Sequence, residues 1–154
     1  MRIVVAVVGK PRDAGLAAAI HDYETRAARY WPLDVREVRE EPARSLSAEQ
    51  VRAREAERLV ASLPTGAHVV SCELDGQTMT SEAFAEWVQR RREEARDLAF
   101  VIGGAYGLGG VVQRAASSRL ALAPWTLPHE IARLVLAEQL YRAGTIVRRE
   151  PYHK

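Results

Sequence analysis

The stretch Val101–Gly110, "VIGGAYGLGG", contains five of the ten glycines in this 154-residue chain. The apolar residues "LAF" precede it and "VVQRAASS" follows it, which predicts a strand, a glycine-rich turn and a helix in that order. Glycines in such a turn either supply positive φ angles or let the backbone approach a ligand or another segment. Their density favours a close approach, and the turn follows a strand, where α/β proteins bind ligands.

Strands and helices alternate along the rest of the chain. The predicted strands are Ile3–Val8, Leu33–Val38, His68–Leu74, Leu98–Ile102 and Ser118–Ala123. The predicted helices are Ala14–Tyr30, a segment from the capping box of Ser47 and Gln50 to Ser62, Ala83–Arg96, a short helix after the glycines, and Glu130–Gly144. The first strand, "IVVAVV", is rich in β-branched residues, as is typical of a strand covered on both faces. This order predicts one α/β domain over residues 1–154, with a mostly parallel sheet.

The composition is that of an ordinary globular protein, with 47% hydrophobic residues, 27% charged residues and a formal net charge of +2. That charge is too small to identify a nucleic-acid-binding protein. A single cysteine, Cys72, excludes an internal disulfide and fits a reducing compartment. The apolar N-terminal run is too short to span a membrane. The sequence contains neither of the metal-binding motifs HExxH and CxxC. We therefore expect a cytoplasmic protein with no membrane partner and no metal.

The glycine-rich stretch matches neither of the common phosphate-binding motifs. A P-loop requires Lys followed by Ser or Thr after its last glycine, whereas Val111 and Val112 follow Gly110. The dinucleotide fingerprint requires glycines at its first, third and sixth positions, a spacing that is absent here. A ligand with a small, uncharged surface, contacted by backbone groups, is therefore favoured.

Two segments near the C-terminus also need an explanation. In Leu120–His129, "LALAPWTLPH", two prolines stiffen a loop around Trp125, which is either a core aromatic or a rigid wall for a flat ring. The helix that follows is apolar around most of its circumference, so we expect it to be wedged inside the fold or buried between subunits. Helical spacing predicts two ion pairs on it, Glu130 with Arg133 and Glu138 with Arg142.

The C-terminal tail, "VRREPYHK", is short, basic and aromatic. Chain ends are usually frayed, which is one interpretation of this segment. Pro151 stiffens it, however, and Tyr152 and His153 are unusual side chains for a loose end. The other interpretation is that the tail folds over a phosphate-bearing substrate.

Taken together, these stretches resemble one family along the whole chain. The segments "VAVVGK", "ELDGQTMTSE", "FVIGGAYGLGG", "LPHEIARLVLAEQLYRA" and the terminal "PYHK" are similar to the ribosomal large-subunit methyltransferase H family, a single-domain branch of the SPOUT methyltransferases. The resemblance implies a SPOUT α/β fold with helices on both faces of the sheet and a deep trefoil knot in the C-terminal half. It also implies that S-adenosylmethionine is bound by backbone groups of the knot loops.

Carried over by position, the resemblance implies eight cofactor-binding residues: Cys72, Gly103, Leu122, Ala123, Pro124, Trp125, Thr126 and Leu127. Cys72 stands where leucine is usual, Pro124 where lysine is frequent, and Trp125 where methionine or leucine is frequent. Backbone contacts and general apolar contacts tolerate such changes. Tyr106 replaces an acidic or amide residue in the glycine loop, and we assign no chemistry to it from the sequence.

The family's substrate is a pseudouridine of 23S rRNA in the assembled ribosome, methylated at ring nitrogen N3 by a homodimer whose partner subunit completes each active site. Attack by N3 requires loss of its proton, so we expect a base or an electropositive setting. His153 is the candidate base, because histidine titrates near neutral pH. Arg142 would orient the target base or lower the pKa of its imide, and Tyr152 would stack on the base or hydrogen-bond to it.

Three other functions stay open at this point. A non-catalytic ribosome- or RNA-binding module would retain the fold without binding the cofactor. A SPOUT methyltransferase acting on tRNA is disfavoured by the YHK ending and by the lack of an appended RNA-binding domain. A generic nucleotide-binding α/β protein is disfavoured by the missing phosphate motifs.

Overall fold

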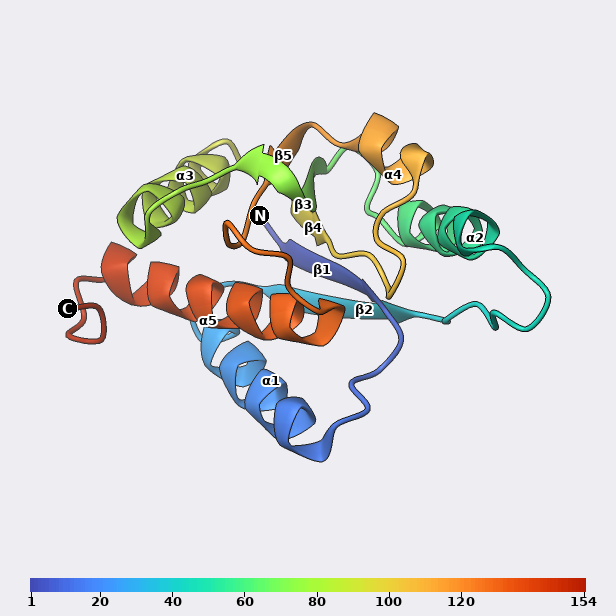
Figure 1. Ribbon diagram of the computed structural model, residues 1–154. Coiled ribbons are helices and arrows are strands. Elements are labelled where there is room, and N and C mark those ends of the chain that lie inside the picture. The colour runs from blue at the N-terminus through green and yellow to red at the C-terminus, as the bar shows by residue number, and fades with distance from the viewer.

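The computed structural model describes residues 1–154 and contains five strands and five helices (Figure 1). The strands are β1 (Ile3–Val8), β2 (Leu33–Val38), β3 (His68–Gln77), β4 (Leu98–Val101) and β5 (Ser118–Leu120). The helices are α1 (Ala14–Ala27), α2 (Ala48–Ala61), α3 (Ser81–Glu93), α4 (Gly110–Ala115) and α5 (His129–Val147). The strands form one sheet in the order β2-β1-β4-β3-β5, and every neighbouring pair is parallel. The predicted α/β class and parallel sheet are confirmed.

Strand β1 lies in the interior of the sheet, between β2 and β4. Ile3 pairs with Leu33 on one side and with Leu98 on the other. Every residue of β1 is buried, as predicted for a strand covered on both faces. Alternate residues therefore point into two separate cores.

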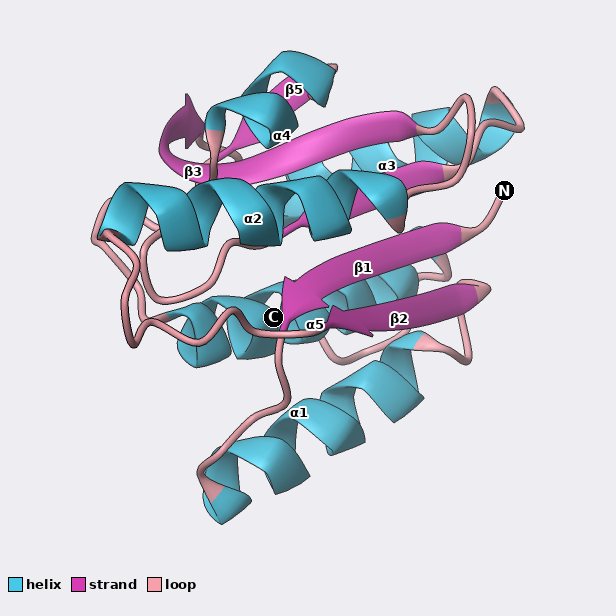
Figure 2. Ribbon diagram, turned by 90° about the vertical axis from the view of Figure 1, so that its right-hand side faces the viewer, coloured by secondary structure: helices cyan, strands magenta, loops and turns pink.

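The helices form a layer on each face of the sheet (Figures 1 and 2). Ile3, Val5 and Val7 pack in the larger core with residues of α1, α3 and α5. Ala6 and Val8 pack in the smaller core with residues of α2 and α4. Helices on both faces are confirmed, whereas the trefoil knot stays a prediction.

The ends of the strands near the glycine loop differ from the prediction. Strand β3 continues through Asp75 to Gln77, where a turn is predicted, and its pairing with β5 shifts register between Cys72 and Gln77. Gly76 permits this, because a Cβ there would lie 2.5 Å from the carbonyl carbon of Leu120. Strand β5 is correspondingly short and ends at Leu120, and the chain then enters the proline-containing loop.

Helix α5 is wedged inside the fold, which was one of its two predicted placements. It lies against α1 and α3, and no residue from Glu130 to Val147 is fully exposed (Figure 1). Gly144 allows α5 to approach the segment that follows α1, because a Cβ there would lie 2.5 Å from Cβ of Tyr30. Burial of α5 thus follows from packing within one chain, and a subunit interface stays a prediction.

Candidate functional site

A cavity of about 760 Å³ lies at the carboxyl edge of the sheet, where β3, β4 and β5 end and α5 begins. This volume is within the usual range for small-molecule sites. We call it the main cavity. Its lining residues are Arg52, Cys72, Glu73, Leu74, Asp75, Ile102, Gly103, Gly104, Ala105, Tyr106, Gly107, Leu108, Gln113, Leu122, Ala123, Trp125, Thr126, Leu127, Pro128, His129 and Ala132.

The main cavity brings together residues that the sequence places in three separate segments. Of the eight predicted cofactor positions, all line the cavity except Pro124, which is exposed on the loop. Trp125 is 76% exposed, so its interpretation as a core aromatic is wrong. The ring stands at the cavity as a surface, which agrees with the alternative interpretation of a wall.

The glycine loop is packed against other parts of the chain, which explains its composition. A Cβ on Gly103 would lie 2.5 Å from the carbonyl oxygen of Gly107, and one on Gly109 would lie 2.7 Å from Cβ of Ala56 in α2. The amide of Gly107, at φ +83°, donates to the carbonyl of Gly104 over 3.0 Å and closes the turn. The same residues from Gly103 to Gly107 line the main cavity. Close approach of the backbone is therefore confirmed, and it shapes one wall of the site.

The charges around the main cavity largely compensate one another. The carboxylates of Glu73 and Asp75 both pair with Arg119, at 3.5 and 3.4 Å. Arg52 adds one further guanidinium to the lining. Glu73 is held in place by Gln113, whose Nε2 donates over 2.5 Å, and by the Ser71 hydroxyl over 2.7 Å. Apolar and backbone groups form most of the remaining wall, so the lining fits a sulfonium ligand with a neutral aromatic ring.

Cys72 presents a neutral thiol to the main cavity. Burial raises the pKa of Cys72 to about 12, and the neighbouring Glu73 carboxylate adds to the shift. The thiol therefore stays protonated at neutral pH and offers the cavity a small, weakly polar surface. This is the kind of contact that tolerates cysteine in place of leucine.

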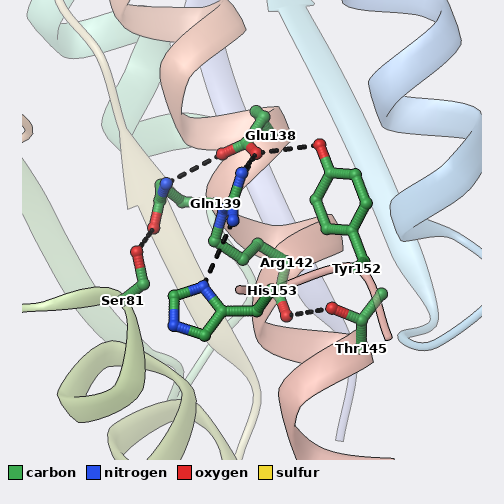
Figure 3. Close-up of polar contacts among 7 residues, drawn as sticks. All are labelled: Ser81, Glu138, Gln139, Arg142, Thr145, Tyr152 and His153. Carbon is green, nitrogen blue, oxygen red and sulfur yellow. Dashed lines mark hydrogen bonds and ion pairs between the residues drawn. The ribbon is translucent and has the colours of Figure 1, made fainter. Parts of the chain in front are cut away.

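The C-terminal tail folds back on α5 and forms an ordered group of side chains, Glu138, Arg142, Tyr152 and His153, which we call the tail cluster (Figure 3). Arg142 donates from Nε and Nη2 to Glu138 Oε1 over 3.0 and 2.5 Å. The Tyr152 hydroxyl donates to the same oxygen over 3.1 Å, and the Arg142 guanidinium lies over the Tyr152 ring at 4.7 Å. The interpretation of the tail as a frayed end is wrong, because these contacts fix it.

His153 is held between Arg142 and the first turn of α3. Its Nδ1 lies 3.2 Å from Nη1 of Arg142, and its Nε2 lies 2.8 Å from Oε1 of Glu82. A guanidinium can only donate, so Nδ1 accepts and Nε2 carries the proton that is donated to Glu82. The hydrogen bond from His153 is the main cause of the lowered pKa of the Glu82 carboxyl.

Two groups of the tail cluster, Arg142 and Tyr152, keep fixed protonation states. Hydrogen bonds to Glu138 raise the pKa of the Arg142 guanidinium, so Arg142 stays charged. Burial, followed by hydrogen bonds with Tyr23 and Glu138, raises the pKa of Tyr152 well above its usual range. Tyr152 is therefore a donor and not a base, and Nδ1 of His153 is the nitrogen acceptor that the cluster offers.

The tail cluster lies far from the main cavity of the same chain. None of its residues lines that cavity, whose contact with α5 is at His129 and Ala132. Arg142 is ten residues further along the helix, a distance of about 15 Å. The structure thus brings the predicted cofactor residues together and the predicted catalytic residues together, but not the two groups with each other.

One predicted ion pair on α5 is wrong and the other is confirmed. Arg133 turns away from Glu130 and instead pairs with Glu24 of α1 at 2.7 Å and with Glu37 of β2 at 3.0 Å. Glu130 accepts from the backbone amide of Arg12 over 2.9 Å. Partners from other segments replace the helical neighbour, because α5 is buried at Arg133 and its guanidinium needs a full set of acceptors there.

Several lining residues have no signal in the sequence motifs. Glu73, Leu74 and Asp75 reach the main cavity because β3 is longer than predicted, and Arg52 reaches it from α2. The rule that ligands bind beyond the carboxyl ends of strands would have indicated the β3 residues. Arg52 depends on how α2 packs against the glycine loop, which the sequence does not reveal.

The structure contains neither a membrane-spanning helix nor a cluster of metal-binding side chains. No helix is both long enough and apolar enough to cross a membrane. No group of three or more His, Cys, Asp or Glu side chains is arranged to hold a metal ion.

The chain is similar to known proteins over its whole length. Residues 1–153 match the family described as "Predicted SPOUT methyltransferase". The chain is 67% identical to the ribosomal RNA large subunit methyltransferase H of Gemmatimonas aurantiaca and 47% identical to that of an Anaeromyxobacter species, in both cases over all of both chains.

Solved structures show the same fold at low sequence identity. A probable methyltransferase from Bordetella pertussis superposes with a TM-score of 0.57 at 14% identity, covering 92% of this chain and 95% of that one. A probable methylase family protein from Haemophilus influenzae gives a TM-score of 0.55 at 16% identity, covering 99% of this chain and 70% of that one. The full-length sequence matches show that the chain belongs to the ribosomal RNA large subunit methyltransferase H family of SPOUT methyltransferases.

Proposed function

We propose that the protein transfers a methyl group from S-adenosylmethionine to N3 of a pseudouridine in 23S rRNA, acting in the cytoplasm on the assembled ribosome. The observation that carries this proposal is the main cavity, which gathers seven of the eight cofactor positions implied by the family in one site of suitable size. Full-length identity of 67% to a large-subunit rRNA methyltransferase supports the choice of substrate.

The cofactor would lie in the main cavity between the glycine loop and the Leu122–Leu127 loop. Bound there, S-adenosylmethionine supplies a methyl group on a positively charged sulfur. Glu73 and Asp75 would offer carboxylate oxygens to that charge in competition with Arg119, and the neutral Cys72 thiol would contribute apolar surface. The two loops would also exclude water around the reacting atoms and fix their relative positions. Much of the catalysis of an in-line methyl transfer comes from this positioning.

Each active site would combine the main cavity of one subunit with the tail cluster of another. The cluster and the cavity of one chain are separated by about 15 Å along α5, so they cannot act on the same base within one chain. In a homodimer whose two-fold axis sets each tail beside the partner's cavity, two equivalent sites would form.

Within the composite site, the tail cluster would prepare the imide for attack. Arg142 stays charged because of Glu138, and its positive charge favours the deprotonated N3. His153 Nδ1 has the lone pair that accepts the N3 proton once Arg142 turns toward the substrate. The neutral Tyr152 hydroxyl donates a hydrogen bond and orients the base.

The test is incubation of the protein with methyl-labelled S-adenosylmethionine and assembled ribosomes from a bacterium that lacks this methyltransferase. We expect label in N3-methylpseudouridine of the large-subunit rRNA after digestion. Label in a tRNA would support a different SPOUT activity. No label and no cofactor binding would contradict the proposal and favour a binding module.

A further inference from the structure

Leu74, Tyr106 and Trp125 are the large hydrophobic side chains that this chain exposes, at 58%, 45% and 76% respectively. Single exposed apolar residues are common on protein surfaces and need no explanation. These three come from β3, the glycine loop and the proline loop, yet all of them line the main cavity. We call them the apolar rim.

The glycine turn fixes the backbone at Tyr106. The hydrogen bond from the Gly107 amide to the Gly104 carbonyl closes the turn around it, and Gly107 takes the positive φ that the turn requires. The Tyr106 side chain has no hydrogen bond and no aromatic partner within the chain, and it also lines a second, smaller cavity of about 360 Å³. The ring is therefore available to a partner from outside the chain.

Arg52 places an uncompensated positive charge beside the apolar rim. Its neighbours on α2, Arg54 and Arg58, both pair with Glu41. The Arg52 side chain has no ion pair and no hydrogen-bond partner in the protein, although it lines the main cavity. An unpaired guanidinium beside exposed aromatic rings is the combination that binds a nucleic-acid backbone and stacks its unpaired bases.

We infer that the apolar rim and Arg52 form the RNA-binding side of the main cavity, with Tyr106 stacking on an unpaired base of the substrate and Arg52 contacting a backbone phosphate. This inference rests on the proposed function and adds a docking site to it. Leu74, Tyr106 and Arg52 lie outside the predicted cofactor positions. Arg52 and Asp75 interrupt the rim with charge, which suits a polar nucleic acid better than the apolar core of a protein interface.

The test compares Tyr106→Ala and Arg52→Gln with the wild type in three measurements: methyl transfer to ribosomes, co-sedimentation with ribosomes, and S-adenosylmethionine binding by calorimetry. We expect each variant to raise the KM for ribosomes and weaken co-sedimentation, about tenfold for loss of a stacked base. The dissociation constant for the cofactor should stay within about twofold. Tyr106→Phe keeps the ring and should restore most of the ribosome affinity that Tyr106→Ala loses.

Arg44→Gln is the matched control, because Arg44 is also unpaired but is exposed and does not line the main cavity. It should behave as the wild type, which separates a specific contact from loss of net charge. Unchanged ribosome affinity in Tyr106→Ala and Arg52→Gln would overturn the inference, as would a loss of cofactor affinity by the same factor. A shift to monomer in sedimentation velocity would also overturn it, because the rim would then be a subunit contact.

The inference and the proposed function fail in distinguishable ways. If the wild type neither methylates nor binds ribosomes, both are wrong. If the wild type does so and the two variants match it, only the RNA-docking site is wrong.

Discussion

The close packing inside the glycine loop can be tested by adding one methyl group. In Gly103→Ala the new Cβ would lie 2.5 Å from the carbonyl oxygen of Gly107 and 2.8 Å from the amide nitrogen of Leu108. Both are backbone atoms, so no side-chain rotation relieves the overlap and the turn must open. Overpacking of this kind costs about 1–3 kcal/mol.

For a chain of this length each kcal/mol corresponds to about 2–4 °C in melting temperature, so Gly103→Ala should melt about 2–12 °C lower. Opening the turn also moves one wall of the main cavity, so the affinity for S-adenosylmethionine should fall. Differential scanning calorimetry and titration calorimetry measure the two effects.

Gly110→Ala is the control for this experiment. Its Cβ would meet only the end of the Arg114 side chain, at 3.1 Å, and that side chain can move. Because Gly110 begins α4, alanine there should leave the stability unchanged or raise it slightly. Our account of the loop is refuted if Gly103→Ala melts with the wild type and binds the cofactor equally well.

Two further predictions concern buried charge. Arg133 is 7% exposed and bridges Glu24 and Glu37. Arg133→Met should therefore lower the free energy of unfolding by about 3 kcal/mol, the lower end for a broken buried pair, because both carboxylates keep some contact with water. An unchanged midpoint of urea denaturation would contradict this. Glu55 is 3% exposed and its Oε1 has no partner, and burial raises the pKa of its carboxyl. The Glu55 carboxyl holds its proton more tightly in the folded state than in the unfolded state. The stability that this binding adds is present below about pH 4, near the unfolded pKa, and is lost as the pH rises through the folded pKa. Glu55→Gln should therefore gain stability relative to the wild type as the pH is raised toward 8 in urea titrations, and a pH-independent difference would show that Glu55 is ionised without penalty.

Local chemistry made most of the secondary structure predictable from the sequence. Strands β1 and β2 have the predicted bounds, and both hydrogen bonds of the Ser47–Gln50 capping box form as predicted. Strand β3 was predicted too short, because its extension depends on β5 approaching Gly76, a contact between segments far apart in the sequence. The sheet order is likewise a property of the folded chain.

The candidate site was predictable only in part. Resemblance to a family located the cofactor positions, and the structure places all of them except Pro124 around the main cavity. Composition and spacing alone would not have located them. The partners of Arg133 and the folded-back tail could not be predicted, because ion pairs in the core depend on which helices pack together and not on spacing along one helix.

If the main cavity and the tail cluster act together from different subunits, two inactive variants should restore activity to each other. His153→Ala lacks the base, and Ala123→Trp fills the cavity. The two proteins are mixed, unfolded and refolded together. Random pairing makes half of the dimers hybrids, each with one intact site, so methyl transfer to ribosomes should recover to about a quarter of the wild-type rate. A mixture no more active than its separate components would contradict the claim and place the reaction within a single subunit.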